Sequence, residues 1–179
     1  EALIDFMPIE KANSQTFYKP CPGGSPLNTA VALGRLKHPV GMLSGISKDL
    51  FGKQLIAHLE ESSVDCSFVV RSNLDTTLAF VSASSLESEV EYAFYAKETA
   101  DRSISFDELP KSFPDNIDVL EFGSISLVME PSASSYENLM IRESTKRFIS
   151  LDPNIRPGFI KDPLFFQKRF ENWLDHVDL

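Results

Sequence analysis

The sequence has few cysteines, a deficit of basic residues and no long hydrophobic run. Only Cys21 and Cys66 are cysteines among its 179 residues, which argues against a disulfide framework and favours a reducing, cytoplasmic location. Acidic residues outnumber basic ones by 26 to 17, and the net charge of −9 argues against a nucleic-acid surface, which needs a basic patch. The apolar runs are far shorter than a membrane span. We therefore expect neither nucleic-acid nor membrane partners.

Several motifs of catalytic or ligand sites are also missing. The eight glycines form no Gly-X-Gly and no Walker loop ending in Gly-Lys-Ser/Thr. No Gly-X-Ser-X-Gly is present, so a Ser-His-Asp nucleophile is not supported. His38, His58 and His176 have no metal-ligand spacing with each other or with cysteine, so no transition-metal site is predicted.

The most informative stretch that is present is Cys21-Pro22-Gly23-Gly24-Ser25-Pro26-Leu27-Asn28, which leads from an extended segment into a helix of small residues. Gly23 and Gly24 can take positive φ and let the backbone approach a ligand closely. Ser25 is predicted to be the N-cap of the helix and Pro26 its first residue. Exposed N–H groups at the helix start would then face a ligand. An ordinary capped turn explains this stretch, taken alone, at least as well.

Short apolar runs alternate with segments of helical periodicity, which predicts a parallel sheet covered by helices on both faces. The expected strands are Ala2–Phe6, Val40–Gly45, Val64–Val70, Ile117–Phe122 and Phe148–Leu151. The expected helices are Pro26–Leu36, a segment through Leu50, Phe51, Leu55, Ile56 and Leu59, Ser132–Lys146 and Pro163–Asp175. The residues of the first helix expected to face the core are Leu27, Ala30, Val31, Leu33 and Gly34. His176–Leu179 has the pattern of the start of another strand.

Two strands in the middle of the chain, Thr76–Ser84 and Glu89–Lys97, depart from this alternation, because Ser85–Ser88 joins them as a hairpin. Along the second strand apolar Val90, Tyr92 and Phe94 alternate with Glu89, Glu91, Ala93 and Tyr95. A two-stranded ribbon is rarely stable alone, so we expect it to pair with the extended chain Met7–Pro22 in a small separate sheet. Periodicity does not distinguish a lid from a plain hairpin extension.

Three segments carry a resemblance to a known family. The order Gly23-Gly24, Asn28, Ala30 resembles the N-terminal signature of the ribokinase-like (PfkB) family of carbohydrate kinases. Glu1–Asp5 is similar to the family's first strand, which ends in a sugar-binding aspartate, and Leu151–Pro157 is similar to the Asp-Pro-Asn-X-Arg segment of fructokinase-like members. The resemblance covers essentially the whole chain. It implies a ribokinase-like three-layer α/β/α fold with a mostly parallel sheet, plus a small β-sheet lid at about residues 7–22 and 76–97.

The chain departs from the family's pattern at two positions where glycine is usual. One is Lys37, which would have to end the first helix in a conformation that glycine adopts more easily. The other is near Ser47, at the end of the following strand.

The resemblance implies an enzyme that uses ATP and Mg²⁺ to phosphorylate a sugar hydroxyl. Carboxylates and amides suit the binding of hydroxyls, and the planar guanidinium of arginine suits phosphate or a carboxylate. The implied sugar-binding residues are Asp5, Gly23, Gly24, Asn28 and Tyr95, and the candidates for phosphate or substrate contact are Arg156, Asn154 and Lys97. Asp5 is expected at the carboxyl end of the first strand, where ligands gather in an open α/β sheet. A surface aspartate, a solvent-facing asparagine and a common Asp-Pro-Asn turn are the alternatives without a function.

The family's catalytic base and anion hole lie in a C-terminal segment of the Gly-Ala-Gly-Asp type, which this sequence lacks. We therefore expect no catalytic residue in the chain and a base beyond Leu179. Residues 1–179 are interpreted as the N-terminal, sugar-binding part of one α/β kinase domain, with a natural short protein as the alternative. The expected activity is fructokinase-like, and the expected protein partner is a second copy through the lid. A kinase for 2-keto-3-deoxygluconate or a nucleoside, and a non-catalytic sugar-binding protein, are the alternatives.

Overall fold

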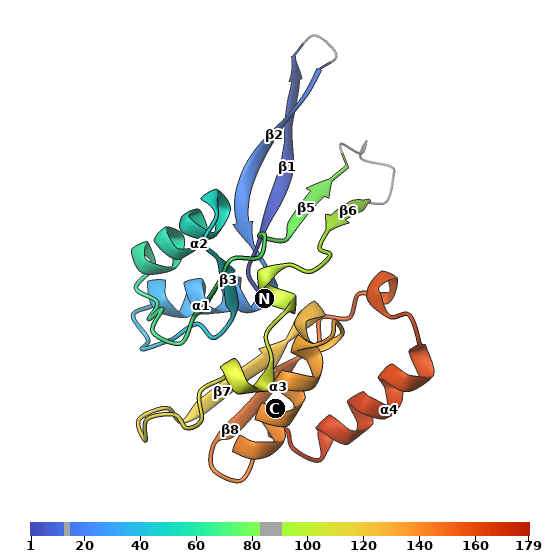
Figure 1. The fold of residues 1–179 in the computed structure, drawn as a ribbon. Helices are drawn as coiled ribbons and strands as arrows, with labels where there is room; N and C mark the ends of the chain where they lie inside the picture. Colours follow the sequence, from blue (N-terminus) through green and yellow to red (C-terminus); the bar gives the residue numbers. More distant parts are fainter. Residues whose placement is uncertain (13–14, 83–90) are drawn as a thin grey trace. The chain divides into compact units, whose positions relative to one another are not determined.

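The structure is a computed structural model that describes residues 1–12, 15–82 and 91–179 (Figure 1). It contains two compact units. The N-terminal unit is Ala2–Asp101, and the C-terminal unit is Arg102–Leu179 together with Glu1. The predicted hairpin loop Ser85–Ser88, and the first two residues of the strand predicted after it, lie outside the described residues.

A four-stranded sheet with the order β2-β1-β5-β6 dominates the N-terminal unit (Figure 1). Strands β1 (Leu3–Ala12) and β2 (Gln15–Gly23) form a long antiparallel hairpin. Strand β5 (Leu78–Val81) runs parallel to β1, and β6 (Tyr92–Tyr95) runs antiparallel to β5. The ribbon therefore pairs with Ile4–Phe6 of β1 and not, as predicted, with Met7–Pro22, and it lies in the same sheet as the first strand rather than in a separate one.

The first strand is longer than predicted. It does not end at Phe6 but continues to Ala12, because its backbone stays paired with β2 beyond that point. Asp5 consequently lies within a continuous strand and not at the carboxyl end of one.

Two helices and a parallel pair of short strands complete the N-terminal unit. Helix α1 (Ser25–Arg35) agrees with the predicted helix within one residue, and α2 (Leu50–Glu61) contains the whole segment predicted as the second helix. Strands β3 (Gly45–Ser47) and β4 (Val70–Ser72) begin where the predicted strands end. The segments predicted as strands before β3 and β4 are joined only by one isolated parallel bridge, between Gly41 and Asp65. The Asp65 carboxylate accepts a hydrogen bond from the Ser67 N–H at 2.8 Å, and this turn prevents a continuous strand there.

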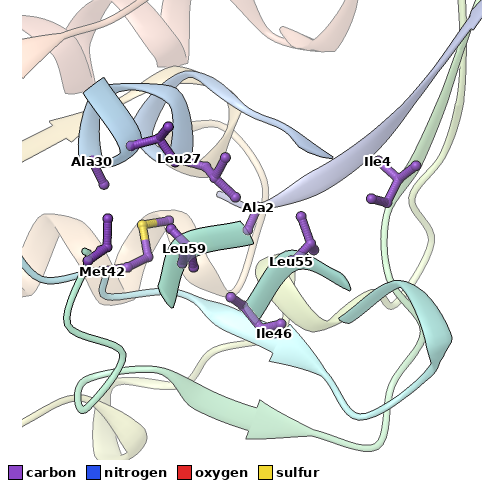
Figure 2. Packing of buried hydrophobic residues seen from close by; sticks show 10 residues of the cluster. Ala2, Ile4, Leu27, Ala30, Met42, Ile46, Leu55 and Leu59 are labelled. Carbon is purple, nitrogen blue, oxygen red and sulfur yellow. The ribbon is translucent and has the colours of Figure 1, made fainter. Parts of the chain in front are cut away.

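The hydrophobic core of this unit is formed by the sheet and both helices (Figure 2). Its members include Ala2 and Ile4 from the start of the chain, Leu27, Ala30 and Val31 from α1, Met42 and Ile46 from the β3 region, and Leu55 and Leu59 from α2. The prediction for α1 is confirmed for all of its inward residues except Leu33, which is 37% exposed. Leu33 lies at the flank of the helix, next to the buried face.

Both departures from the family's glycine pattern have a visible local explanation. Lys37 ends α1 with φ 67°, as predicted, and it allows a Schellman turn in which the N–H of His38 donates to the carbonyl of Leu33 at 3.0 Å. The buried Ser47 accepts a hydrogen bond through its hydroxyl from the N–H of Asp49 at 3.0 Å.

The C-terminal unit contains a parallel strand pair, β7 (Val119–Gly123) and β8 (Phe148–Asp152), with helices α3 (Ser132–Glu143) and α4 (Pro163–Leu174). The end of the chain pairs with β8, since the N–H of Leu151 donates to the carbonyl of Leu179 at 2.9 Å. The last four residues, for which the start of a strand was predicted, form no strand in the structure. Among the described residues, no helix has the length and hydrophobicity that spanning a membrane requires.

Candidate functional site

The carboxylate of Asp5 lies against the backbone of Gly23. The register pairs Leu3 with Gly23 and Asp5 with Cys21, so strand alternation puts Asp5 and Gly23 on the same face of the sheet. A Cβ added to Gly23 would lie 2.1 Å from the Asp5 Oδ2 atom and 2.9 Å from its Cγ. The carboxylate thus fills the space that any other side chain at position 23 would occupy. We call this arrangement, made by Asp5 and Gly23, the Asp5 notch.

Glycine is required at positions 23 and 24 for different structural reasons. Gly24 has φ 108°, a conformation that favours glycine, whereas Gly23 is required by the close approach of Asp5. Gly24 is also the N-cap of α1, and its carbonyl accepts the N–H of Asn28 at 2.9 Å. The predicted cap at Ser25 is therefore wrong by one residue, because the turn at Gly24 already brings its carbonyl into the helical pattern.

The Asp5 notch is next to the start of α1, since Gly23 immediately precedes the helix cap. The N-terminal end of a helix favours negative charge, so this position suits a carboxylate and the hydroxyl groups that donate to it. Asn28 lies in the first turn of α1 and is exposed. Its contact with a sugar remains a prediction.

The structure does not bring Tyr95 together with the Asp5 notch. Tyr95 pairs with Leu78, and Leu78 pairs with Ile4, so its side chain is on the opposite face of the sheet from Asp5. Its ring packs edge-to-face on Phe80, with 5.6 Å between centroids. Lys97 is exposed and follows the end of β6.

Two aromatic residues of β6 share the face of Asp5, and neither was predicted from the sequence as a site residue. They are Tyr92 and Phe94, whose rings stack with 5.7 Å between centroids, and Tyr92 is 54% exposed. The alternation along this strand separates Tyr92 from Tyr95. Which of the two shares the face of Asp5 depends on the pairing of Phe94 with Ala79, and that register is not visible in the sequence.

Hydrogen bonds hold the two residues that precede β5, Thr76 and Thr77, in position beside β1. The Asp49 carboxylate caps α2 through the N–H of Gly52 at 2.7 Å and also accepts from the N–H and hydroxyl of Thr76, at 2.9 and 2.8 Å. Burial acts to raise the pKa of Asp49, but the hydrogen bonds from Gly52 and Thr76 outweigh it and hold the pKa below its usual value. The next residue, Thr77, accepts the N–H of Ile4 on its carbonyl at 3.0 Å. These contacts align the strand that carries Asp5.

In the C-terminal unit, the predicted Asp-Pro-Asn-X-Arg segment forms a tight loop at the end of β8. The Asp152 carboxylate accepts the N–H of Asn154 at 3.1 Å, and Asn154 has φ 39°. The guanidinium of Arg156 donates to the Asn154 Oδ1 atom at 2.6 Å. Asn154 therefore holds the exposed Arg156 side chain in place. A guanidinium positioned in this way can bind a phosphate or a carboxylate.

A pocket of about 330 Å³ also lies in the C-terminal unit, beside α4. It is lined by Leu127, Val128, Met129, Glu130, Phe159, Ile160, Lys161, Asp162, Phe165, Phe166 and Arg169, and so by none of the predicted site residues. The buried Arg169 pairs with Glu130 at 2.6 Å and with Glu137. Burial acts to raise the pKa of Glu130, but hydrogen bonds from Arg169 and Ser134 lower it below its usual value. This pocket was not predicted from the sequence. The four-residue spacing of Phe165 and Arg169, which puts both on one face of α4, was the available signal.

The described residues include no group of three or more histidine, cysteine, aspartate or glutamate side chains that could hold a metal ion. Mg²⁺ in kinases is held by a few carboxylates together with the phosphates of the substrate. We assign no metal ligand among the described residues.

Comparison with known proteins gives a consistent result. The chain is 43% identical over 162 residues to a protein named fructokinase from Rhizobium leguminosarum bv. trifolii, a match that covers 90% of the chain and 49% of that relative. It is similar to the crystal structure of fructokinase with bound ATP from Xylella fastidiosa, with a TM-score of 0.88 and 27% identity over 99% of the chain and 57% of that structure.

A further similar structure is fructokinase from Vibrio cholerae O395 in a form with fructose, ADP and calcium ion bound. Its TM-score is 0.82 at 26% identity, over 99% of the chain and 56% of that structure. The predicted fold class is confirmed by these structures. The chain spans about half the length of the curated relatives that it matches. Because the family described as pfkB family carbohydrate kinase matches residues 2–179, the chain belongs to that family.

Proposed function

We propose that the whole protein is an ATP-dependent sugar kinase with fructose as its preferred substrate. The observation that carries this proposal is the Asp5 notch, in which a carboxylate is held against a glycine beside a helix start. Membership of the family and the 43% identity to a fructokinase support the choice of reaction and of sugar.

In this proposal the N-terminal unit binds the sugar. The two carboxylate oxygens of Asp5 accept hydrogen bonds from sugar hydroxyls, because an ionised carboxylate is a pure acceptor. Gly23 leaves room for the Asp5 carboxylate, Gly24 lets the sugar approach the backbone, and Asn28 adds a side-chain amide in the first turn of α1. Binding in a fixed orientation contributes to rate by holding one hydroxyl ready for reaction.

The phosphate side of the reaction is proposed to involve Arg156, held by Asn154, with Lys97 as a further candidate for phosphate contact. When bound, Mg²⁺ would neutralise charge on the phosphates of ATP. The base that takes the proton from the sugar hydroxyl is proposed to lie in sequence that follows Leu179 in the whole protein. The residues of this chain therefore bind and orient, and they take no proton.

We further propose that the four-stranded sheet is a lid and the contact surface for a second copy of the chain. Its outer part exposes apolar side chains, and this supports burial against something else. These side chains include Met7, Ile9 and Phe17, which are 42%, 48% and 47% exposed. A cytoplasmic location is proposed as well, and it is supported by the two free cysteines.

The proposal is tested by a coupled ADP-release assay on the full-length protein. The panel contains fructose, other hexoses, 2-keto-3-deoxygluconate and nucleosides. We expect fructose to give the highest kcat/KM, and we expect no turnover by the 179-residue chain alone, because it lacks the base. Binding of fructose by calorimetry without any ADP release would indicate a non-catalytic sugar-binding protein. A higher kcat/KM for 2-keto-3-deoxygluconate or a nucleoside would reassign the substrate.

A further inference from the structure

We propose that Cys21 forms the apolar wall of the sugar subsite beside Asp5, and that this wall selects a sugar presenting a C–H group there. This inference rests on the proposed function, because it takes Asp5 to be the sugar-binding carboxylate. It adds a specificity-determining residue on β2 to that site.

The register puts Cys21 directly opposite Asp5 on the same face of the sheet. Residues paired in this way in an antiparallel sheet have their Cβ atoms about 4.5–5.5 Å apart. On the other side, β5 pairs Ala79 with Asp5, and Ala79 has no exposed surface. Cys21, in contrast, is partly exposed. A ligand on Asp5 therefore meets Cys21 and not Ala79 as its lateral neighbour.

The direction of the Asp5 carboxylate strengthens this placement. Its Oδ2 atom lies 2.1 Å from the position that a Cβ of Gly23 would take, so the carboxylate leans along the strand towards Gly23. The surface over Cys21 is thus not covered by the Asp5 carboxylate. Farther along the same face comes Met7, which is 42% exposed and lies opposite Lys19, so the apolar surface ends at a charged side chain.

The chemistry of the thiol makes this wall apolar. A cysteine side chain behaves as a small hydrophobic group with a weak donor. The Sγ atom of Cys21 lies 3.7 Å from the carbonyl oxygen of Lys19, within its own strand, so its weak donor is directed at the backbone. A sugar hydroxyl placed against this wall would lose water without gaining a good hydrogen bond, whereas a C–H group would fit.

The two cysteines of the chain provide a direct test with an internal control. Cys66 is also free and partly exposed, and it packs against the core of the same unit. Burial, followed by the nearby Glu60 and Asp65 carboxylates, raises the pKa of the Cys66 thiol. The full-length protein is treated with iodoacetamide, with and without fructose. Mass spectrometry of the peptide that contains each cysteine then measures its rate of alkylation.

We expect fructose at ten times its dissociation constant to slow alkylation of Cys21 about tenfold and to leave the rate at Cys66 unchanged, because occupancy limits access. We also expect Cys21→Leu to raise the fructose KM about tenfold with the ATP KM unchanged, because the larger side chain fills the subsite. The matched control is Thr16→Leu, on the opposite face of the same strand, which should leave both KM values unchanged.

The outcomes separate this inference from the proposed function. If calorimetry shows that fructose binds while the alkylation rate of Cys21 and the KM of Cys21→Leu stay unchanged, the inference is overturned and the proposed function stands. If fructose does not bind to the full-length protein at all, the proposed function fails, and the role of Cys21 fails with it.

Discussion

The N-terminal unit fixes its proposed functional side chain by close packing, whereas the C-terminal unit fixes its own by hydrogen bonds within a loop. Asp5 lies within β1, between β2 and β5, and its carboxylate fills the space over Gly23. Arg156 is exposed, and its guanidinium is held by the Oδ1 atom of Asn154 at 2.6 Å. The position of the Asp5 carboxylate thus depends on the space that the backbone leaves over Gly23, whereas the position of Arg156 depends on hydrogen bonds within its loop. Substitutions near Asp5 should therefore have the larger effects.

The largest effect is expected from Asp5→Asn in the full-length protein. The substitution keeps the size of the side chain but turns one acceptor oxygen into a donor, so at least one hydrogen bond from a sugar hydroxyl is lost. We expect the fructose KM to rise about 100-fold, in line with loss of a charged hydrogen bond, while the ATP KM changes little. Steady-state kinetics with each substrate varied in turn checks this. An unchanged fructose KM would refute the placement of Asp5 in the sugar site.

A somewhat smaller effect is expected from Gly23→Ala. The new Cβ would meet the end of the Asp5 side chain at 2.1 Å, so the carboxylate must move away from the notch. We expect the fructose KM to rise about tenfold, since a small misplacement of a binding group weakens binding without abolishing it.

The melting temperature of Gly23→Ala shows whether the substitution acts on the sugar site or on folding. The atom displaced is the far end of a flexible side chain and not backbone, so we expect the melting temperature to change by less than about 3 °C. If the melting temperature falls strongly in step with the KM, the glycine is required for folding, and the contrast between the two units is lost.

In the C-terminal unit, Asn154→Gly should have a modest effect. Glycine accepts the φ of 39° without strain, so the variant removes the side-chain hydrogen bond to Arg156 and keeps its longer bonds to the carbonyls of Asn154 and Ile155, at 3.3 and 3.4 Å. We expect kcat/KM to fall about threefold to fivefold, because a guanidinium held only by these carbonyls samples other positions. Arg156→Ala is the matched comparison and should have the larger effect. Equal losses in the two variants would mean that Arg156 acts only when Asn154 holds it.

The smallest effect is expected at Lys37, which follows the opposite end of α1 from the Asp5 notch. This residue ends α1 at φ 67°, where glycine is unstrained. We expect Lys37→Gly to stabilise the protein by about 1 kcal/mol and to leave the kinetic constants unchanged. Chemical denaturation measures the free energy of unfolding. A change in fructose KM in this variant would show that the end of α1 is coupled to the notch.

Helices were predictable from the sequence to a greater extent than strands. The spacing of Leu55 and Leu59 predicts the buried face of α2, on which both side chains are buried. For Val40–Gly45 the apolar run indicates burial, but burial does not tell where strand hydrogen bonds begin, and β3 starts only at Gly45. The extension of β1 to Ala12 was missed for the same reason, since a strand that continues into a hairpin has no break in its pattern.

Motifs in the sequence were enough to select Asp5 and Gly23, but the geometry of the candidate site could not be predicted. Asp5 and Gly23 could be chosen from their motifs, yet their contact depends on a diagonal neighbour relation across β1 and β2. The same dependence on register separates Tyr95 from Asp5 and places Tyr92 and Cys21 on the face of Asp5. A shift of one residue in the pairing of a strand would move each of its side chains to the opposite face of the sheet.

The central claim is that Gly23 serves the sugar site by leaving room for the Asp5 carboxylate. A double-mutant cycle on the fructose KM, with Gly23→Ala, Asp5→Ala and the double variant of the full-length protein, tests it most directly. We predict that Gly23→Ala raises the KM about tenfold when Asp5 is present and has almost no effect when Asp5 is alanine, because nothing is then left to displace. Equal and additive effects of Gly23→Ala in both backgrounds would contradict the account.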